Sequence, residues 1–227
     1  MPNYVKNVVT IEGSVKRRTE LGRLLKSGDN VFDFENIIPT PKSLLNVDAT
    51  TASAIAQRIA KYKYEHAEDK TAVLDEIVEV PDLCFPVHAT VSYLINQLKE
   101  DEMYNALDIS QVPQYLENIE KYGYPHWYDW RVLNWGTKWN SCDADGDVLD
   151  GYEFDTAYSM PELIYRKISK MFPTLKIHVK YADENVYGDN CGSVCFKNGE
   201  VIEDEPISDK FQFSCDLLGL DVDDYTE

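Results

Sequence analysis

Apolar and polar residues alternate at the start of the chain and in its last third, and this pattern predicts β-strands there. The first strand is expected over residues 4–11, ending at the Glu12-Gly13 turn. Later strands are expected over 152–156, 175–181 and 194–202. The last of these segments is a hairpin, because Asn198-Gly199 readily supplies the two positive φ angles of a type I′ turn.

Apolar residues at helical spacing predict helices between and after these strands. The helices are expected over 14–26, 51–64, 88–107, 113–120, 159–171 and 208–220. Ser14 and Ser159 are the expected N-caps of two of them. In the helix after Ser159, we expect Leu163, Ile164 and Ile168 to face inward. Residues 32–38 alternate briefly, which predicts a short extended segment before the loop at Pro39 and Pro41.

The order of these elements predicts an α+β fold in which a sheet is backed by helices. The chain has 227 residues, enough for one large or two small domains with a sizeable core. We expect residues 1–44 and 126–227 to form the α+β part and residues 45–125 to form a helical insertion.

The charge is strongly negative and uneven. Forty Asp and Glu oppose 22 Lys and Arg, a formal charge of −18. Residues 1–139 carry 20 acidic and 15 basic side chains, a charge of −5, whereas residues 140–227 carry 20 and 7, a charge of −13. A polyanion of this kind is not expected to bind duplex nucleic acid or an anionic membrane directly. Basic proteins are the partners to expect.

Export and membrane insertion are not expected. No run of 18 or more apolar residues occurs, and a strand-like segment follows the start where a signal peptide would have its apolar region. The five cysteines are irregularly spaced, unlike a disulfide framework. These features predict a cytoplasmic protein with free thiols.

Metal and cofactor sites are not expected either. Cys191 and Cys195 are the one close pair of cysteines, and no second pair of zinc ligands follows at short spacing. His178 alternates with Ile177 and Val179 and should therefore lie on the opposite face of its strand.

An acidic segment resembles the start of a calcium loop. Counted from Asp143, however, position 6 is Val148 where glycine is required, and position 12 is Phe154 where glutamate is required, so an EF-hand is excluded. A looser oxygen site remains an alternative to a solvated acidic turn, which we favour. Its candidate ligands are Asp143, Asp145, Asp147 and Asp150.

All four tryptophans lie within 13 residues, between Trp127 and Trp139. Such density can form a stacking platform for bases or a sugar, and then Trp135, Lys138 and Trp139 would carry the ligand. The alternative is a core strand with bulky side chains. We favour the core, because a nucleic-acid platform also needs a cationic rim and few cations are local.

No catalytic motif is present: the chain lacks GxSxG, a Walker loop, GxGxxG and HExxH. An enzyme is therefore not expected. A metal- or thiol-dependent enzyme would have to be assembled in three dimensions from Cys142, Cys191, Cys195 and His126.

Three sequence blocks and the segment after them resemble a known family. They are MPNY with Asn7 at 1–13, FDFENIIPTP at 32–41, NWGTKW at 134–139 and FDTAYS at 154–159. Together they resemble the YubB-like family of uncharacterised phage and plasmid proteins. The resemblance implies a C-terminal ferredoxin-like domain with an antiparallel sheet and a mobile-element context. It implies no activity and no catalytic residue.

These observations lead to one principal hypothesis and one alternative. The principal hypothesis is a non-enzymatic phage or plasmid protein that binds and inhibits a host complex, such as a nuclease or defence complex, as an acidic mimic of nucleic acid. Its expected contact residues are Asp143, Asp145, Asp147, Asp150, Glu203, Asp204 and Glu205. The alternative is a small-ligand or single-stranded nucleic-acid binder that uses the tryptophan-rich segment.

Overall fold

The structure, a computed structural model, describes residues 3–48, 53–54, 56–57, 60 and 110–224. Backbone contacts divide the chain into two compact units, Met1–Pro39 with Arg131–Glu227, and Thr40–Trp130. The helix predicted over 88–107 lies outside the described residues, as does most of the one predicted over 51–64.

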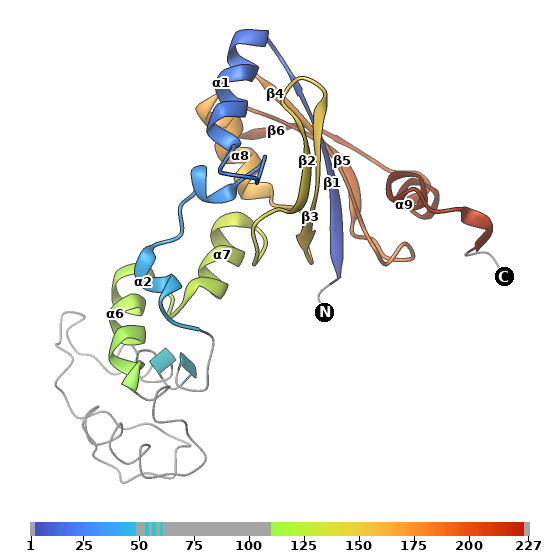
Figure 1. The fold of residues 1–227 in the computed structure, drawn as a ribbon. Coiled ribbons are helices and arrows are strands. Elements are labelled where there is room, and N and C mark those ends of the chain that lie inside the picture. The colour runs from blue at the N-terminus through green and yellow to red at the C-terminus, as the bar shows by residue number, and fades with distance from the viewer. Residues whose placement is uncertain (1–2, 49–52, 55, 58–59, 61–109, 225–227) are drawn as a thin grey trace. The chain divides into compact units, whose positions relative to one another are not determined.

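The first unit is built on a six-stranded antiparallel sheet. Figure 1 shows this sheet with the helices beside it. Its strands are β1 (Tyr4–Glu12), β2 (Cys142–Asp147), β3 (Gly151–Ala157), β4 (Lys176–Asp183), β5 (Cys191–Lys197) and β6 (Glu200–Glu205). The order across the sheet is β2-β3-β1-β4-β5-β6, so β2 and β6 are the edges. The predicted α+β fold is confirmed.

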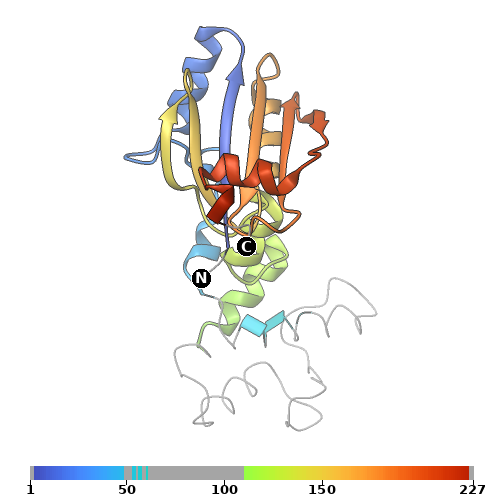
Figure 2. The same cartoon turned by 90° about the vertical axis from the view of Figure 1, so that its right-hand side faces the viewer.

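Helices lie on both faces of this sheet (Figures 1 and 2). Two helices, α1 (Val15–Leu25) and α8 (Glu162–Met171), cover the face that we call the inner face. The third, α9 (Lys210–Leu218), contacts β4 and β5 from the opposite, outer face. Side chains alternate along β1, so Val5 and Val9 are buried on the inner face while Lys6 and Val8 point outward.

The helix ends follow the predicted chemistry in one case and depart from it in another. Ser14 caps α1 by accepting a hydrogen bond from the Arg17 N–H, as expected. Ser159 does not cap α8, because its hydroxyl donates to the Gly136 carbonyl and the helix begins later, after Pro161. Ile164 and Ile168 are buried as predicted, whereas Leu163 is 38% exposed, because the buried side of α8 is formed by Ile164, Tyr165, Ile168 and Ser169.

Two segments predicted to be extended are helical instead. The Asp33 carboxylate accepts the Glu35 N–H and so starts a 3₁₀ turn, η1 (Phe34–Asn36), where we expected an extended segment. The tryptophan-rich segment forms α7 (Trp127–Trp135), and not a core strand. In both segments the bulky apolar side chains that suggested a strand are also compatible with one buried side of a short helix.

The described part of the second unit contains the short α2 (Lys42–Leu45), α6 (Val112–Tyr122) and the start of α7. Gly123 ends α6 with a left-handed residue, close to the predicted end. The buried Asn118 amide donates to the carbonyls of Ser43 and Pro125, and this bonding ties α6 to the segments on either side.

The end of β2 before its turn into β3 contains Gly146, which pairs with Tyr152 and has a φ of +96°. A Cβ at this position would lie 2.1 Å from the Gly151 carbonyl oxygen. We therefore expect Gly146→Ala to lower the free energy of unfolding by about 2 kcal/mol, measured by urea denaturation. Gly28→Ala is the matched control, since Gly28 also has positive φ (+58°) but nothing within 4 Å of its added Cβ. An equal loss in both variants would show that the clash contributes nothing.

Candidate functional site

The predicted acidic residues lie on the two edge strands. Asp143, Asp145 and Asp147 belong to β2 and Asp150 to the turn after it, whereas Glu203, Asp204 and Glu205 belong to β6. Five strand spacings separate β2 from β6, or about 24 Å. The structure therefore does not bring the two acidic groups together. Charged side chains on both edges also have an ordinary function, because they oppose edge-to-edge pairing with another sheet.

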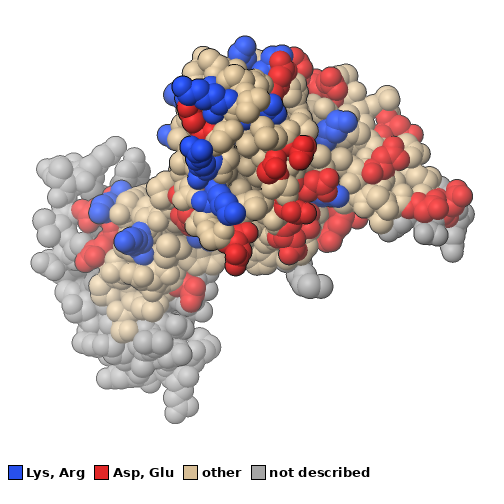
Figure 3. Space-filling model, turned by 45° about the horizontal axis from the view of Figure 1, so that its top comes forward, with Lys and Arg blue, Asp and Glu red and all other residues tan. Residues whose placement is uncertain are grey.

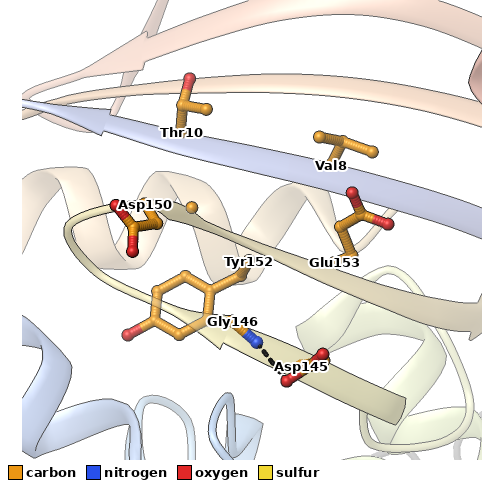
Figure 4. A pocket seen from close by; sticks show the side chains of 8 residues that line it. Val8, Thr10, Asp145, Gly146, Asp150, Tyr152 and Glu153 are labelled. Atoms are coloured by element: carbon orange, nitrogen blue, oxygen red, sulfur yellow. Dashed lines mark hydrogen bonds between the residues drawn. The ribbon is translucent and has the colours of Figure 1, made fainter.

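One register row places acidic side chains on the outer face beside β1. Asp145 pairs with Glu153, and Glu153 pairs with Val8 of β1. A shallow hollow of about 220 Å³ lies at this place, and Val8 and Thr10 are among its lining residues (Figure 4). The carboxylates at the hollow are those of Asp145, Asp150 and Glu153. Apolar contact beside several carboxylates suits the stem and head of a lysine or arginine side chain.

Asp147 has two backbone N–H donors from the turn, whereas its neighbour Asp145 accepts one, from Gly146 at 2.7 Å. One oxygen accepts the N–H groups of Leu149 at 2.6 Å and Asp150 at 2.9 Å. These two backbone hydrogen bonds hold the pKa of Asp147 below its usual range. We therefore assign Asp147 to the turn and leave Asp145 and Asp150 as the candidate contact residues.

Basic side chains are concentrated on the helices of the inner face. In α1, the residues Lys16, Arg17, Arg18 and Arg23 accompany one acidic residue, Glu20; α8 carries Arg166, Lys167 and Lys170 with Glu162. The Arg17 guanidinium lies 4.9 Å from the ring of Phe172, which follows α8, so the two helices are neighbours. Figure 3 shows Lys and Arg gathered over this layer and Asp and Glu gathered away from it. The charge is thus separated between the helical layer and the edge strands.

A second polar cluster lies on the outer face toward β6. His178 pairs with Cys195, and Cys195 pairs with Glu203, so three strands place these side chains in one row. The Cys195 Sγ lies 3.9 Å from His178 Nε2. Burial raises the pKa of the Cys195 thiol, and the Glu203 carboxylate raises it further.

Glu12 borders this cluster from the end of β1. Its Oε2 accepts from Lys176 Nζ at 3.2 Å and lies 3.4 Å from His178 Nε2. The hydrogen bond from Lys176 is the largest influence that lowers the pKa of Glu12, and the one from His178 is the next. Sequence reasoning missed Glu12 and Glu203 as neighbours of His178, since residues so far apart meet only through the strand register.

Comparison with known proteins finds a family match for the C-terminal part of the chain. Residues 134–222 match the family described as "Ferredoxin-like domain in Api92-like protein". No curated protein matches the chain. A solved structure of protein api92 from Yersinia pseudotuberculosis is similar, with 11% sequence identity and a TM-score of 0.44, and the match covers 92% of this chain and 99% of that one.

The ferredoxin-like domain is completed by a strand that lies outside the matched residues. The matched range contains β2 to β6, α8 and α9, but β1 lies between β3 and β4 in the sheet. The sheet therefore needs the N-terminal segment as well as residues 134–222. The predicted ferredoxin-like architecture is confirmed, whereas the YubB-like family and the phage or plasmid origin stay predictions.

The motifs that suggested the family resemblance hold the ferredoxin-like domain together. Thr137 donates to the Ala157 carbonyl at 2.8 Å, which joins NWGTKW to FDTAYS. Asn140, directly after NWGTKW, donates to Asp33 at 2.7 Å and accepts from the Phe34 N–H at 2.9 Å, which joins that segment to η1. These contacts are largely buried and internal, so the most distinctive motifs are explained by folding and do not mark a ligand site.

The aromatic candidates are divided between the core and the surface. Trp135 is fully buried and its indole N–H donates to the Ile38 carbonyl at 2.8 Å. It therefore cannot stack on a ligand, and its predicted role in the stacking platform is wrong. Trp139 is partly exposed, and the Lys138 ammonium lies 4.1 Å from its ring and 4.7 Å from that of Tyr158. Each cation–π contact places the Lys138 ammonium over one face of a ring, so that face is not available to a ligand.

The cysteines proposed for a thiol-dependent enzyme do not lie together in one site. Cys142 lies on edge strand β2, four strands away from Cys195 on β5. Cys191 lies on the outer face like Cys195, but four residues along the strand, or about 13 Å. His126 belongs to the second unit, where burial lowers its pKa and its Nδ1 accepts the Tyr128 N–H. Cys195 instead lies beside His178, a histidine outside the predicted set.

No helix in the described ranges is long and apolar enough to cross a membrane.

Proposed function

We propose that this protein is a non-enzymatic phage or plasmid accessory protein that binds a basic host protein complex and inhibits it. The observation that carries the proposal is the hollow beside β1, where Asp145, Asp150 and Glu153 meet the apolar surface of Val8. A lysine or arginine of the partner would place its stem on Val8 and its charged head among the carboxylates.

Inhibition follows from competition for the same basic surface. A nuclease or defence complex binds nucleic-acid phosphates through lysine and arginine side chains. The exposed carboxylates of the β2–β3 hairpin would occupy such a surface in place of phosphates, and the complementary charge would speed association. The ferredoxin-like match supports the fold that presents the hairpin, and the family resemblance supports the mobile-element context.

A partner's cation would compete with an internal ion pair of modest strength for Glu153. Lys6 Nζ contacts Glu153 Oε2 at 3.0 Å, with side chains 29% and 60% exposed. Exposed pairs of this kind contribute about 0.2–1 kcal/mol, so a partner's cation can displace Lys6 at small cost.

The proposal is tested by charge reversal at the hollow. Full-length protein is used to capture partners from host lysate at low salt, and the affinity of the captured complex is then measured against salt concentration. We expect Asp145→Lys with Asp150→Lys to weaken binding by about tenfold or more, because two contacts reverse sign. We also expect the wild-type affinity to fall as salt rises.

The matched control is Asp204→Lys with Glu205→Lys on the opposite edge strand, since it changes the net charge by the same amount. At about 0.15 M salt, where the Debye length is about 8 Å, it should alter affinity by less than about threefold, because exposed charges farther away than this are screened. Equal weakening by both pairs would overturn the placement of the site at the hollow. Recovery of no basic nucleic-acid-binding protein would overturn the proposed function.

A further inference from the structure

Three side chains of metal-binding types lie in one row across β4, β5 and β6. His178 pairs with Cys195, which pairs with Glu203, so all three project from the outer face. One imidazole nitrogen, one sulfur and one carboxylate oxygen lie within 4.8 Å of one another. Within the described part of the chain, this is the one group of three or more His, Cys, Asp or Glu residues that meets this distance.

We propose that His178, Cys195 and Glu203 bind a divalent cation of the zinc class, and that Glu12 becomes the fourth ligand after its side chain rotates toward them. Thiolate sulfur, imidazole nitrogen and carboxylate oxygen are the donors that zinc takes in proteins, at bond lengths of about 2.0–2.3 Å. Tetrahedral bonds of that length place neighbouring donor atoms about 3.3–3.8 Å apart. The Sγ–Nε2 distance of 3.9 Å already approaches this separation.

The donor atoms must come closer together to bind one cation, and the side chains that would move are those of Glu203 and His178. Glu203 is exposed and the His178 side chain is 37% exposed, so both can rotate inward by about 1 Å without disturbing the core. Cys195 is only 2% exposed, and its strand position fixes the sulfur at the base of the cluster. The site is thus anchored at its base and open to solvent on the side from which a cation would enter.

Glu12 borders the group of three and supplies the fourth donor after a rotation, because its carboxylate lies outside the set of ligand atoms within 4.8 Å of one another. Its Oε2 lies 3.4 Å from His178 Nε2, a separation that a shared cation allows for this pair. Lys176 now supplies the opposing charge, at 3.2 Å from that oxygen. On binding, the cation replaces the ammonium as the counter-charge of Glu12, Lys176 turns into solvent, and the Cys195 thiol releases its proton to water.

An internal ion pair alone explains only part of this arrangement. The Glu12–Lys176 pair accounts for the position of Glu12, and His178 can join it. Neither contact requires a thiol beside the imidazole or a second carboxylate opposite that thiol. A metal ion uses all four groups and relieves the repulsion between the two carboxylates and a thiolate.

The test uses the purified full-length protein after treatment with a chelator. Zinc chloride is titrated against a competing chromophoric chelator, and cobalt chloride is followed by absorption in the thiolate-to-cobalt charge-transfer region. We expect one equivalent to bind with micromolar affinity or better. We expect Cys195→Ser to abolish the charge-transfer band and to weaken zinc binding by at least about 100-fold, since even outer-shell losses cost 10–100-fold.

Further variants keep the result interpretable. His178→Gln and Glu203→Gln alter side chains that reach solvent, so their folding should be retained while zinc binding weakens in parallel with Cys195→Ser. Cys142→Ser is the matched control, because Cys142 lies on the opposite edge strand, and it should leave affinity within about twofold. Sub-stoichiometric binding by the wild-type protein, or binding that is unchanged in the three ligand variants, would overturn the proposal.

Discussion

Replacing Trp135 by alanine is expected to lower the free energy of unfolding by about 3–5 kcal/mol, the usual range for a fully buried large aromatic residue. The indole ring packs edge-on against Phe34, with centroids 5.6 Å apart, and the Arg131 guanidinium lies 4.4 Å from the ring. The substitution also leaves the Ile38 carbonyl without its 2.8 Å indole donor. Urea denaturation followed by far-ultraviolet circular dichroism measures the loss without relying on tryptophan fluorescence.

Trp139→Ala is the control, since it removes a tryptophan from the same motif at a partly exposed position. Its main contacts are the Lys138 ammonium at 4.1 Å and the Tyr4 ring at 6.4 Å, and we expect a loss of about 1 kcal/mol. Comparable losses in the two variants would mean that Trp135 is not the core anchor described above.

The strands with regular alternation were predictable because each buries one face. In β4, Ile177 and Val179 are buried and His178 points to the outer face, as the alternation predicts. The last hairpin turns where expected, with positive φ at Asn198 and Gly199. Such elements follow from local patterns, since the period of two and the turn residues are both visible in the sequence.

The row of His178, Cys195 and Glu203 could not be predicted, because a β-bulge changes the pairing between β5 and β6. A regular two-residue turn at Asn198-Gly199 would place Ile202 opposite Cys195. The bulge between Cys195 and Phe196 shifts the pairing by one residue, so Glu203 takes that position. A shift of one residue moves each later side chain of the strand to the opposite face of the sheet. No feature of the local sequence indicates this shift.

Strand β2 was also beyond prediction from the sequence, for a different reason. Its sequence, CDADGD, has low strand propensity and resembles a calcium loop. It becomes a strand because β3 offers a free edge for pairing, and charged residues are tolerated there since one side stays in solvent. The hollow proposed as the binding site depends on this pairing, so the sequence predicted its acidic residues but not their arrangement beside β1.

The distinctive motifs proved to be the least informative about function. Asn7, in the N-terminal block, and Thr156, in FDTAYS, hydrogen-bond to each other in the core at 2.9 Å. Both side chains have no exposed surface. Buried polar groups must be satisfied by specific partners, so such positions are constrained by folding alone.

This buried network leads to the second large effect, at Asn7. The Asn7 amide donates to the Val5 carbonyl and to Thr156 Oγ1, and its carbonyl oxygen accepts from the Tyr165 hydroxyl at 3.0 Å. Burial raises the pKa of Tyr165 well above its usual range, so this hydroxyl stays protonated and donates. We expect Asn7→Ala to lower the free energy of unfolding by about 3 kcal/mol. The substitution removes packed atoms and also leaves the buried groups of Val5, Thr156 and Tyr165 without their Asn7 hydrogen bonds.

A double-mutant cycle separates two costs of Asn7→Ala: the Tyr165 hydroxyl left without its acceptor, and the lost packing of Asn7. Tyr165→Phe alone should cost about 1–2 kcal/mol, since it removes the donor and leaves one acceptor unmet. In the Asn7→Ala background the same change should cost about 1 kcal/mol less or even stabilise the protein, because it removes a hydroxyl that no longer has its Asn7 partner. Additive losses, measured by urea denaturation of all four proteins, would contradict a coupled network. The loss in Asn7→Ala would then be assigned to the packing of Asn7 against the sheet and not to its hydrogen bond with Tyr165.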